Sequence, residues 1–313
     1  MSAPARRVAR SIRLLVSSMS AGGRSVSVGP SVVRALRAGG WAVEVTVTTS
    51  SDDPMAFAAS ATEDVVAALG GDGFLSAVAR GCHESGALFA PIPGGRGNDL
   101  CRALGIGPDP IARARTLADL GFREDEADAE LAARTRPLDG MWVESDEGRR
   151  RSLVLGVVSL GLDARANVLA NESFLTSGPL AYGYGAFAAL ASYRPTAIRA
   201  RVDGVERDLT GWLASISNSG RIGGGIRLVP TSDLHDGRIE LCHVGPIPLR
   251  KALPVLTKVV AGRSDGHDVI EVEEVRDVEV LEPRGLIAMA DGDRVAEVPF
   301  TAHCAPGVVE VLI

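Results

Sequence analysis

Two short glycine-rich segments, each carrying an aspartate, are the parts of this sequence best suited to chemistry. The first is Gly70–Gly73 (GGDG) and the second is Pro93–Asp99 (PGGRGND). Glycine lets a backbone turn tightly and approach a ligand closely. A helix that begins at such a turn offers free N–H groups and a partial positive charge to an anion. The pair predicts a phosphate cradle made by Gly70, Gly71, Asp72, Gly73, Gly95, Arg96, Gly97 and Asn98.

Asp72 and Asp99 give this predicted cradle its chemical character. A carboxylate beside a bare phosphate is repelled, but it is useful when Mg²⁺ lies between them, because Mg²⁺ prefers oxygen ligands and keeps several waters. We therefore expect Asp72 and Asp99 to help hold Mg²⁺. The alternative is that both residues only cap helices. The matching composition of the two loops favours the functional interpretation.

Lysine is almost absent, which excludes one common phosphate-binding device. The 33 Lys+Arg residues include only two lysines, Lys251 and Lys258, and neither follows a glycine-rich loop. A P-loop needs a lysine that reaches the β- and γ-phosphates. Any phosphate must then be held by backbone N–H groups, arginine or a metal ion. The formal net charge of −6 also argues against a nucleic-acid partner.

The cysteines and the apolar runs are typical of a cytoplasmic protein. The four cysteines are scattered among apolar or small neighbours without a CxxC pair, which favours buried thiols in a reducing compartment. The apolar run Ser11–Ser17 is too short for a signal peptide. No apolar run reaches the roughly 18–20 residues that a membrane span needs.

Strand and helix signals alternate through the first part of the chain, which predicts βαβ units around a parallel sheet. Ligands of such sheets bind outside the carboxyl ends of the strands, so both glycine loops are expected at one edge. The expected strands are Ile12–Val16, Trp41–Thr48, Asp64–Leu69 and Leu88–Ile92. The expected helices are Pro30–Ala38, Pro54–Ala61, Phe74–Gly81, Asp99–Leu104 and Pro110–Leu120.

The pattern changes after the charged stretch Glu124–Arg136, where short β-like runs separated by turns predict an antiparallel sandwich or barrel. Helices are expected at Gly183–Ser192 and Leu249–Ala261. The latter carries cations among apolar residues, so it is either an interfacial element or, as Pro254 favours, a packed helix. The expected strands are Leu138–Val143, Leu153–Val158, Ile198–Val202, Gly211–Ser217, Arg238–Val244, Asp277–Leu281 and Val308–Leu312.

The order of the motifs resembles the diacylglycerol kinase catalytic-domain family, which includes bacterial diacylglycerol kinases, is related to sphingosine and ceramide kinases, and is more distantly similar to NAD kinases. GGDG is followed by P-x-G-x-G-N-D, and the likeness extends from Ile12 to Ile313. Later segments that resemble the family are Ser159–Ala164, Gly178–Tyr182, Gly223–Pro230, Leu234–Gly237 and Asp291–Asp293.

The resemblance implies an α/β protein of two domains. An N-terminal three-layer parallel-sheet nucleotide domain, residues 1–135, would bind ATP, and a C-terminal β-sandwich-like domain, residues 136–304, would bind the lipid. A cleft between them would hold both substrates, and a last strand at about 305–313 would return to the first domain. The implied partner is a lipid at the membrane surface, reached by peripheral association, with a homodimer left open.

The activity that the resemblance implies is ATP-dependent transfer of the γ-phosphate to a lipid hydroxyl, most simply that of diacylglycerol to give phosphatidic acid. Asp291 matches the general base, Asp72 the alternative base or a water-mediated magnesium ligand, and Asp99 the residue that orders the magnesium–water network. Asp236 matches a ligand of a second, structural Mg²⁺, although the neighbouring His235 is a poor magnesium ligand. Without the resemblance, Asp291-Gly292 and the turn at Asp236-Gly237 are plain hairpin turns.

Three departures from the family leave room for a non-catalytic protein. The first loop, Ser17–Gly23, lacks the usual N-P-x-x-G, Phe74 replaces a threonine, and Arg96 replaces a hydroxyl residue. Arg96 either makes a charge-assisted phosphate contact or points into solvent. The alternatives are an NAD-kinase-like or sphingosine-kinase-like phosphotransferase, or a non-catalytic protein that binds lipid or nucleotide.

Overall fold

The computed structural model describes residues 8–123, 125–145, 148–162, 164, 194–222, 226–260 and 269–313. Contacts divide the chain into two units. The first comprises Met1–Leu138 and Val308–Ile313, and the second comprises Asp139–Gly307. The expected helix Gly183–Ser192 and the motif segments Gly178–Tyr182 and Gly223–Gly225 lie outside the described residues.

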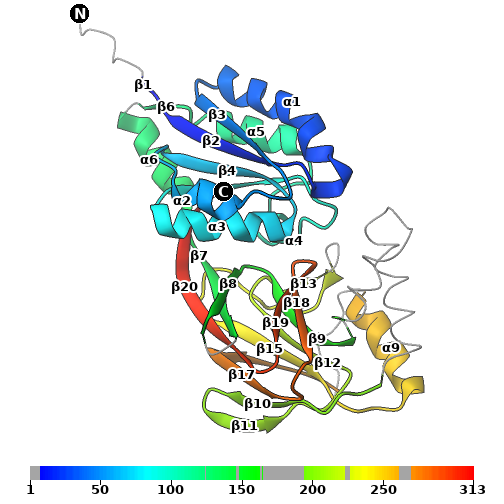
Figure 1. Ribbon diagram of the computed structural model, residues 1–313. Helices are drawn as coiled ribbons and strands as arrows, with labels where there is room; N and C mark the ends of the chain where they lie inside the picture. Colours follow the sequence, from blue (N-terminus) through cyan, green and yellow to red (C-terminus); the bar gives the residue numbers. More distant parts are fainter. Residues whose placement is uncertain are drawn as a thin grey trace, which may run out of the picture. The chain divides into compact units, whose positions relative to one another are not determined.

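The first unit is built on a parallel sheet (Figure 1). All six residues of β4 are buried, because helices cover both faces of a parallel sheet. The last strand of the chain extends the sheet in parallel, with Val311 opposite Phe89. The strand order is β3 (Ala42–Thr48), β2 (Ser11–Ser17), β4 (Val65–Gly70), β5 (Leu88–Pro93) and the end of β20 (Phe300–Leu312).

Helices lie on both sides of this sheet and complete three layers. On one side α1 (Arg24–Ala38) and α5 (Pro110–Ala118) pack together, and Leu36 and Leu117 join Ile12 in one buried cluster. Figure 1 shows α2 (Pro54–Ala59) and α3 (Asp72–Ser85) on the other side. The shorter elements are β1 (Val8–Ala9), α4 (Asp99–Ala103), β6 (Phe122–Arg123) and α6 (Asp125–Arg134). The predicted parallel-sheet domain is confirmed.

One helix of the first unit starts earlier than expected. The sequence pattern put the helix start at Pro30, because proline is favoured at the first helical position. In the structure α1 begins at Arg24, directly after Gly23 in a left-handed conformation, and Pro30 lies inside the helix. The glycine turn before Arg24 therefore fixes the start of the helix, and the proline does not.

The second unit consists of two antiparallel sheets, which confirms the sandwich-like expectation. Val158 and Ile216 from one sheet share a buried core with Val280 and Phe300 from the other. One sheet contains β11 (Val205–Asp208), β10 (Arg199–Val202), β17 (Asp277–Glu282), β20, β7 (Thr135–Ser145) and β8 (Arg150–Val154). The other has the order β16 (Ile270–Val275), β15 (Ile239–Val244), β12 (Leu213–Ser217), β9 (Val157–Gly161), β18 (Ile287–Ala290) and β19 (Asp293–Glu297).

A short hairpin and a helix accompany the sandwich. The hairpin is formed by β13 (Arg221–Ile222) and β14 (Ile226–Arg227), and the helix is α9 (Leu249–Val260). No helix among the described residues is long and apolar enough to cross a membrane.

The expected strand Leu153–Val158 is wrong, because the structure has two strands, β8 and β9, that break at Leu155-Gly156. The carbonyl oxygen of Gly156 accepts the backbone N–H groups of Asn218 and Ser219, at 3.0 and 3.4 Å. The chain therefore changes direction at a glycine, which an unbroken apolar run does not reveal.

Candidate active site

The two glycine loops leave the same edge of the first unit's sheet. Strand β4 ends at Gly70 and β5 ends at Pro93, and these two residues are paired in the parallel ladder. The backbone N–H of Gly94 donates to the carbonyl oxygen of Gly70 at 2.8 Å. The loops therefore run side by side at the carboxyl ends of neighbouring strands, as the sequence predicts.

Steric exclusion explains the glycines at the closest approach. A Cβ added to Gly95 would lie 2.5 Å from the Cα of Gly71, and one added to Gly94 would lie 2.3 Å from Ser25 Oγ. The Ser25 hydroxyl donates to the carbonyl oxygen of Gly94 at 3.2 Å. A side chain at either glycine would push the two loops apart.

Asn98 holds the shape of the second loop. Its backbone is left-handed, with φ of 54°, which asparagine tolerates better than most residues. Its Oδ1 accepts from Gly95 N at 2.8 Å and its Nδ2 donates to Gly95 O at 3.1 Å. The contact of Asn98 with a cofactor stays a prediction.

Asp72 joins the two loops. Its Oδ1 accepts the backbone N–H of Leu100, at the start of α4, at 3.0 Å. Burial raises the pKa of the Asp72 carboxyl, and the backbone N–H groups of Leu100 and Asp99 oppose that rise. Asp72 therefore does cap a helix, but the helix is α4 of the neighbouring loop. An N–H group expected to be free for an anion is already used by Asp72.

Asp99 and Arg96 lie on the second loop itself. Asp99 is the first residue of α4 and is partly exposed. The Arg96 side chain is exposed, and it makes no hydrogen bond or ion pair with the described residues of its unit. Gly97 O accepts from Arg102 Nε at 3.0 Å. Arg96 is therefore an exposed cation of the second loop that can meet an incoming anion.

A metal ion would need ligands beyond the protein here. Among the described residues, no group of three or more His, Cys, Asp and Glu side chains gathers to hold a metal. Mg²⁺ in kinases is commonly held by one or two carboxylates together with substrate phosphates. The Asp72 and Asp99 pair on adjoining loops fits that kind of site.

Asp291 lies in a tight hairpin of the second unit. Asp291 and Gly292, with φ of 53° and 92°, form the two-residue turn between β18 and β19. These are the positive φ values of a type I′ turn, so the hairpin interpretation describes the backbone correctly.

The carboxylate of Asp291 lies against the backbone of Gly156. Strand β18 pairs with β9 through Ala290 opposite Val158, which carries Asp291 alongside the break before β9. A Cβ added to Gly156 would lie 2.3 Å from Asp291 Oδ1. Sequence reasoning missed Gly156, because no motif marks it.

Asp236 also lies in a turn. Its Oδ1 accepts from Arg238 N at 2.9 Å, which is the pattern of an aspartate turn. Burial raises the pKa of the Asp236 carboxyl, and the nearby acids Asp233 and Asp139 raise it further. The hairpin interpretation is wrong here, because the segment before Asp236 forms no strand and β15 pairs with β12 and β16 instead. The role of Asp236 as a metal ligand stays a prediction.

Two further buried acids of the second unit were missed. The side chain of Asp139 accepts the backbone N–H groups of Gly237 and Gly307, each at 2.6 Å. Glu240 Oε2 accepts from Ser232 Oγ at 2.5 Å. Burial raises the pKa of Glu240 to about 7. Both acids sit in strand-like runs whose spacing gives no sign of a buried charge.

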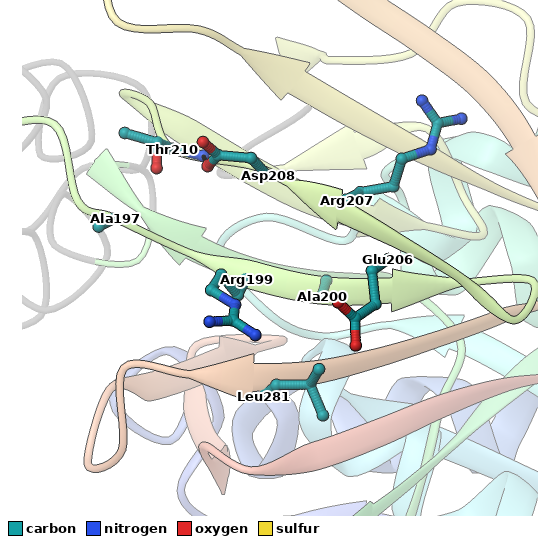
Figure 2. Close-up of a pocket in the computed structure, with 8 residues that line it drawn as sticks. All are labelled: Ala197, Arg199, Ala200, Glu206, Arg207, Asp208, Thr210 and Leu281. Atoms are coloured by element: carbon teal, nitrogen blue, oxygen red, sulfur yellow. Dashed lines mark hydrogen bonds between the residues drawn. The ribbon is translucent and has the colours of Figure 1, made fainter.

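A cavity of about 380 Å³ on β10, β11 and β17 lies apart from these residues within the second unit (Figure 2). Its charged groups already have protein partners. Arg207 pairs with Glu273 at 3.0 Å, and Asp208 accepts from Thr210 N at 2.9 Å. None of the predicted site residues lines it.

The predicted site residues divide between the two units. Asp72 and Asp99 lie on adjoining loops of the first unit, and Asp291 and Asp236 lie in turns of the second. That Asp72, Asp99 and Asp291 meet at one triphosphate stays a prediction.

The lysine-free glycine loops at the edge of a parallel sheet fit a phosphate-binding site that is not a P-loop. The chain belongs to the diacylglycerol kinase catalytic-domain family, and it is a kinase of the lipid kinase class. Residues 11–126 match the diacylglycerol kinase catalytic domain, and residues 156–313 match the YegS C-terminal NAD kinase beta sandwich-like domain.

Similar curated proteins share most of their length with this chain. A diacylglycerol kinase of Mycobacterium tuberculosis (strain ATCC 25618 / H37Rv) is 26% identical over 82% of this chain and 79% of its own length. A probable lipid kinase YegS-like protein of Xanthomonas euvesicatoria is 28% identical over 88% and 87%. The crystal structure of a putative diacylglycerol kinase from Bacillus anthracis shares the fold, with a TM-score of 0.73, 18% identity and 97% coverage of both chains.

Proposed function

We propose that this protein transfers the γ-phosphate of ATP to the hydroxyl of diacylglycerol and so forms phosphatidic acid. The hydrogen bond that ties the GGDG loop to the start of α4 carries the proposal, since it makes one continuous edge from two lysine-free glycine loops. The names of the similar proteins support diacylglycerol as the acceptor.

Phosphate binding is assigned to the first unit. The start of α3 would present N–H groups and a positive dipole end to phosphate oxygens, since the N–H groups of Gly94 and Gly95 already donate within the loops. Arg96 adds a charge-assisted contact. Asp99, with Asp72, would hold Mg²⁺, which when bound neutralises the charge on the β- and γ-phosphates.

Proton transfer is assigned to Asp291. The lipid hydroxyl oxygen forms the new bond to the γ-phosphorus, the bond from that phosphorus to the bridging oxygen breaks, and ADP leaves. Asp291 accepts the hydroxyl proton. Asp72 is less suited to this step because its Oδ1 already accepts the Leu100 N–H.

The test is transfer of label from [γ-³²P]ATP in detergent micelles with Mg²⁺. The acceptors offered in parallel are diacylglycerol, ceramide, sphingosine and, without detergent, NAD. We expect labelled phosphatidic acid from the wild type and at least about 100-fold slower labelling with Asp291→Asn. Labelled NADP without labelled lipid would establish the NAD-kinase-like alternative, and absence of any labelled product would contradict the kinase assignment.

A further inference from the structure

The two lysines of the chain lie on the same helix. Lys251 and Lys258 both belong to α9, together with Arg250. The sequence from Leu241 to Ser264 contains no acidic residue, although the whole chain has 39 Asp+Glu among 313 residues. A cationic segment of this kind stands out in a protein with a net charge of −6.

These cations share one face of α9. At 3.6 residues per turn, positions 250, 251, 254 and 258 fall within an arc of about 100°. The four residues there, Arg250, Lys251, Pro254 and Lys258, are all exposed. We call Arg250, Lys251 and Lys258 the basic face.

Another face fixes the helix to the second unit. Ala252 is 1% exposed and lies in a buried cluster with Trp212 and Leu228. Val255 is also buried. Figure 1 shows α9 beside the sandwich, outside its two sheets. The helix is therefore packed, as Pro254 suggested, and it still presents a row of cations to solvent.

We propose that the basic face of α9 docks this protein on an anionic bilayer surface. The proposal rests on the proposed function, because diacylglycerol resides in a membrane and the enzyme must reach it there. Charge complementarity identifies the partner. A protein with net charge −6 is repelled by anionic lipid unless a local cationic face opposes that repulsion.

The size of the effect follows from the number of cations. Each Lys or Arg near an anionic surface strengthens binding about five-fold, so three of them contribute about 100-fold. The attraction is screened by salt, because exposed charges interact weakly beyond a Debye length.

The test is flotation of the full chain with vesicles of phosphatidylcholine alone or mixed with phosphatidylglycerol. The variant is Arg250→Gln, Lys251→Gln and Lys258→Gln combined. The matched control is Arg34→Gln, Arg37→Gln and Arg115→Gln, which removes the same charge from exposed positions of α1 and α5. We expect the variant to bind mixed vesicles about 100-fold more weakly and the control to bind like the wild type.

Several results would overturn the proposal. One is a variant that floats like the wild type, and another is a wild type that does not distinguish the two vesicle types. Wild-type binding to heparin, lost in the variant and without any vesicle binding, would instead assign the basic face to an acidic macromolecule.

A second assay separates this proposal from the proposed function. With a short-chain diacylglycerol dispersed in detergent, we expect the variant to retain the wild-type kcat, which also shows that it is folded. If the wild type phosphorylates no lipid there, the proposed function fails. A variant that binds vesicles normally while both proteins phosphorylate diacylglycerol contradicts only the docking proposal.

Discussion

Asp72 and Asp291 each precede a glycine in the sequence, but the two units hold them in different ways. Asp72 accepts the Leu100 N–H and so connects two loops of the first unit. Asp291 sits at the apex of a two-residue hairpin of the second unit, with its carboxylate against Gly156. The comparison shows that the same Asp-Gly dipeptide has two uses. In the first unit its carboxylate connects two loops, and in the second unit it lies at the tip of a hairpin.

The largest expected effect is that of Asp291→Asn. The amide has nearly the same shape but cannot accept the hydroxyl proton, so we expect kcat to fall by about 10²–10⁴. Steady-state kinetics with diacylglycerol micelles measure this, and thermal unfolding should be unchanged. A variant with nearly normal kcat would show that Asp291 is not the base. The proposed difference in role between Asp291 and Asp72 would then be lost.

Asp139→Ala tests a buried acid that holds two backbone segments of the second unit. Asp139 is buried, and its removal would leave the backbone N–H groups of Gly237 and Gly307 without their acceptor. We expect the free energy of unfolding to fall by about 2–5 kcal/mol, measured in urea. The control is Asp203→Ala, since exposed Asp203 also accepts two backbone N–H groups, from Arg276 and Asp277. Equal losses in both variants would contradict burial as the cause.

Gly156→Ala tests whether the backbone of Gly156 positions the Asp291 carboxylate. The added methyl group would displace the carboxylate, and a displacement of that kind costs about 10² in kcat. The KM for ATP should stay the same, because the change lies in the second unit. Gly107→Ala is a suitable control, since a Cβ there meets nothing within 4 Å. A Gly156→Ala enzyme with normal kcat would show that the contact does not position Asp291.

Asp72→Asn should act in the opposite direction on stability and on activity. Burial raises the pKa of Asp72 above its value in the unfolded chain, so stability falls as the pH rises from the unfolded pKa through the folded pKa. The neutral amide still accepts from Leu100, and we expect a gain of about 0.5–2 kcal/mol at pH 8 with reduced activity. Urea unfolding of the wild type and the variant, at pH 8 and at acidic pH, measures this difference in stability. A loss of stability at pH 8 would mean that the charge itself holds α4.

Glu240→Gln should change only the pH dependence of the free energy of unfolding. The pKa of Glu240 is raised to about 7, so the folded state retains a proton that the unfolded chain releases at lower pH. Stability of the wild type should therefore fall as the pH rises from about 4.5 through 7. In the variant, this fall of the free energy of unfolding between about pH 4.5 and 7 should disappear. Urea titrations at several pH values measure it. An unchanged slope would assign it to other acids.

Much of the fold was predictable because its signals are local. The alternation that gives β2, β4 and β5 and the glycine loops at their ends follow from periodicity and from the conformational freedom of glycine. The early start of α1 was missed although its signal, the left-handed Gly23, is local. The break at Gly156 was not predictable, since it depends on hydrogen bonds from the distant residues Asn218 and Ser219.

The sequence alone determined which groups are available: lysine-free glycine loops, their two aspartates, a hairpin with Asp291 and a cationic helix. These are properties of residue type and short spacing, which hold before the chain folds. The tertiary structure decided what each group contacts. Strand pairing brings the Leu100 N–H to the Asp72 carboxylate and the Gly156 backbone to the Asp291 carboxylate. Contacts between residues far apart in the chain do not follow from local sterics.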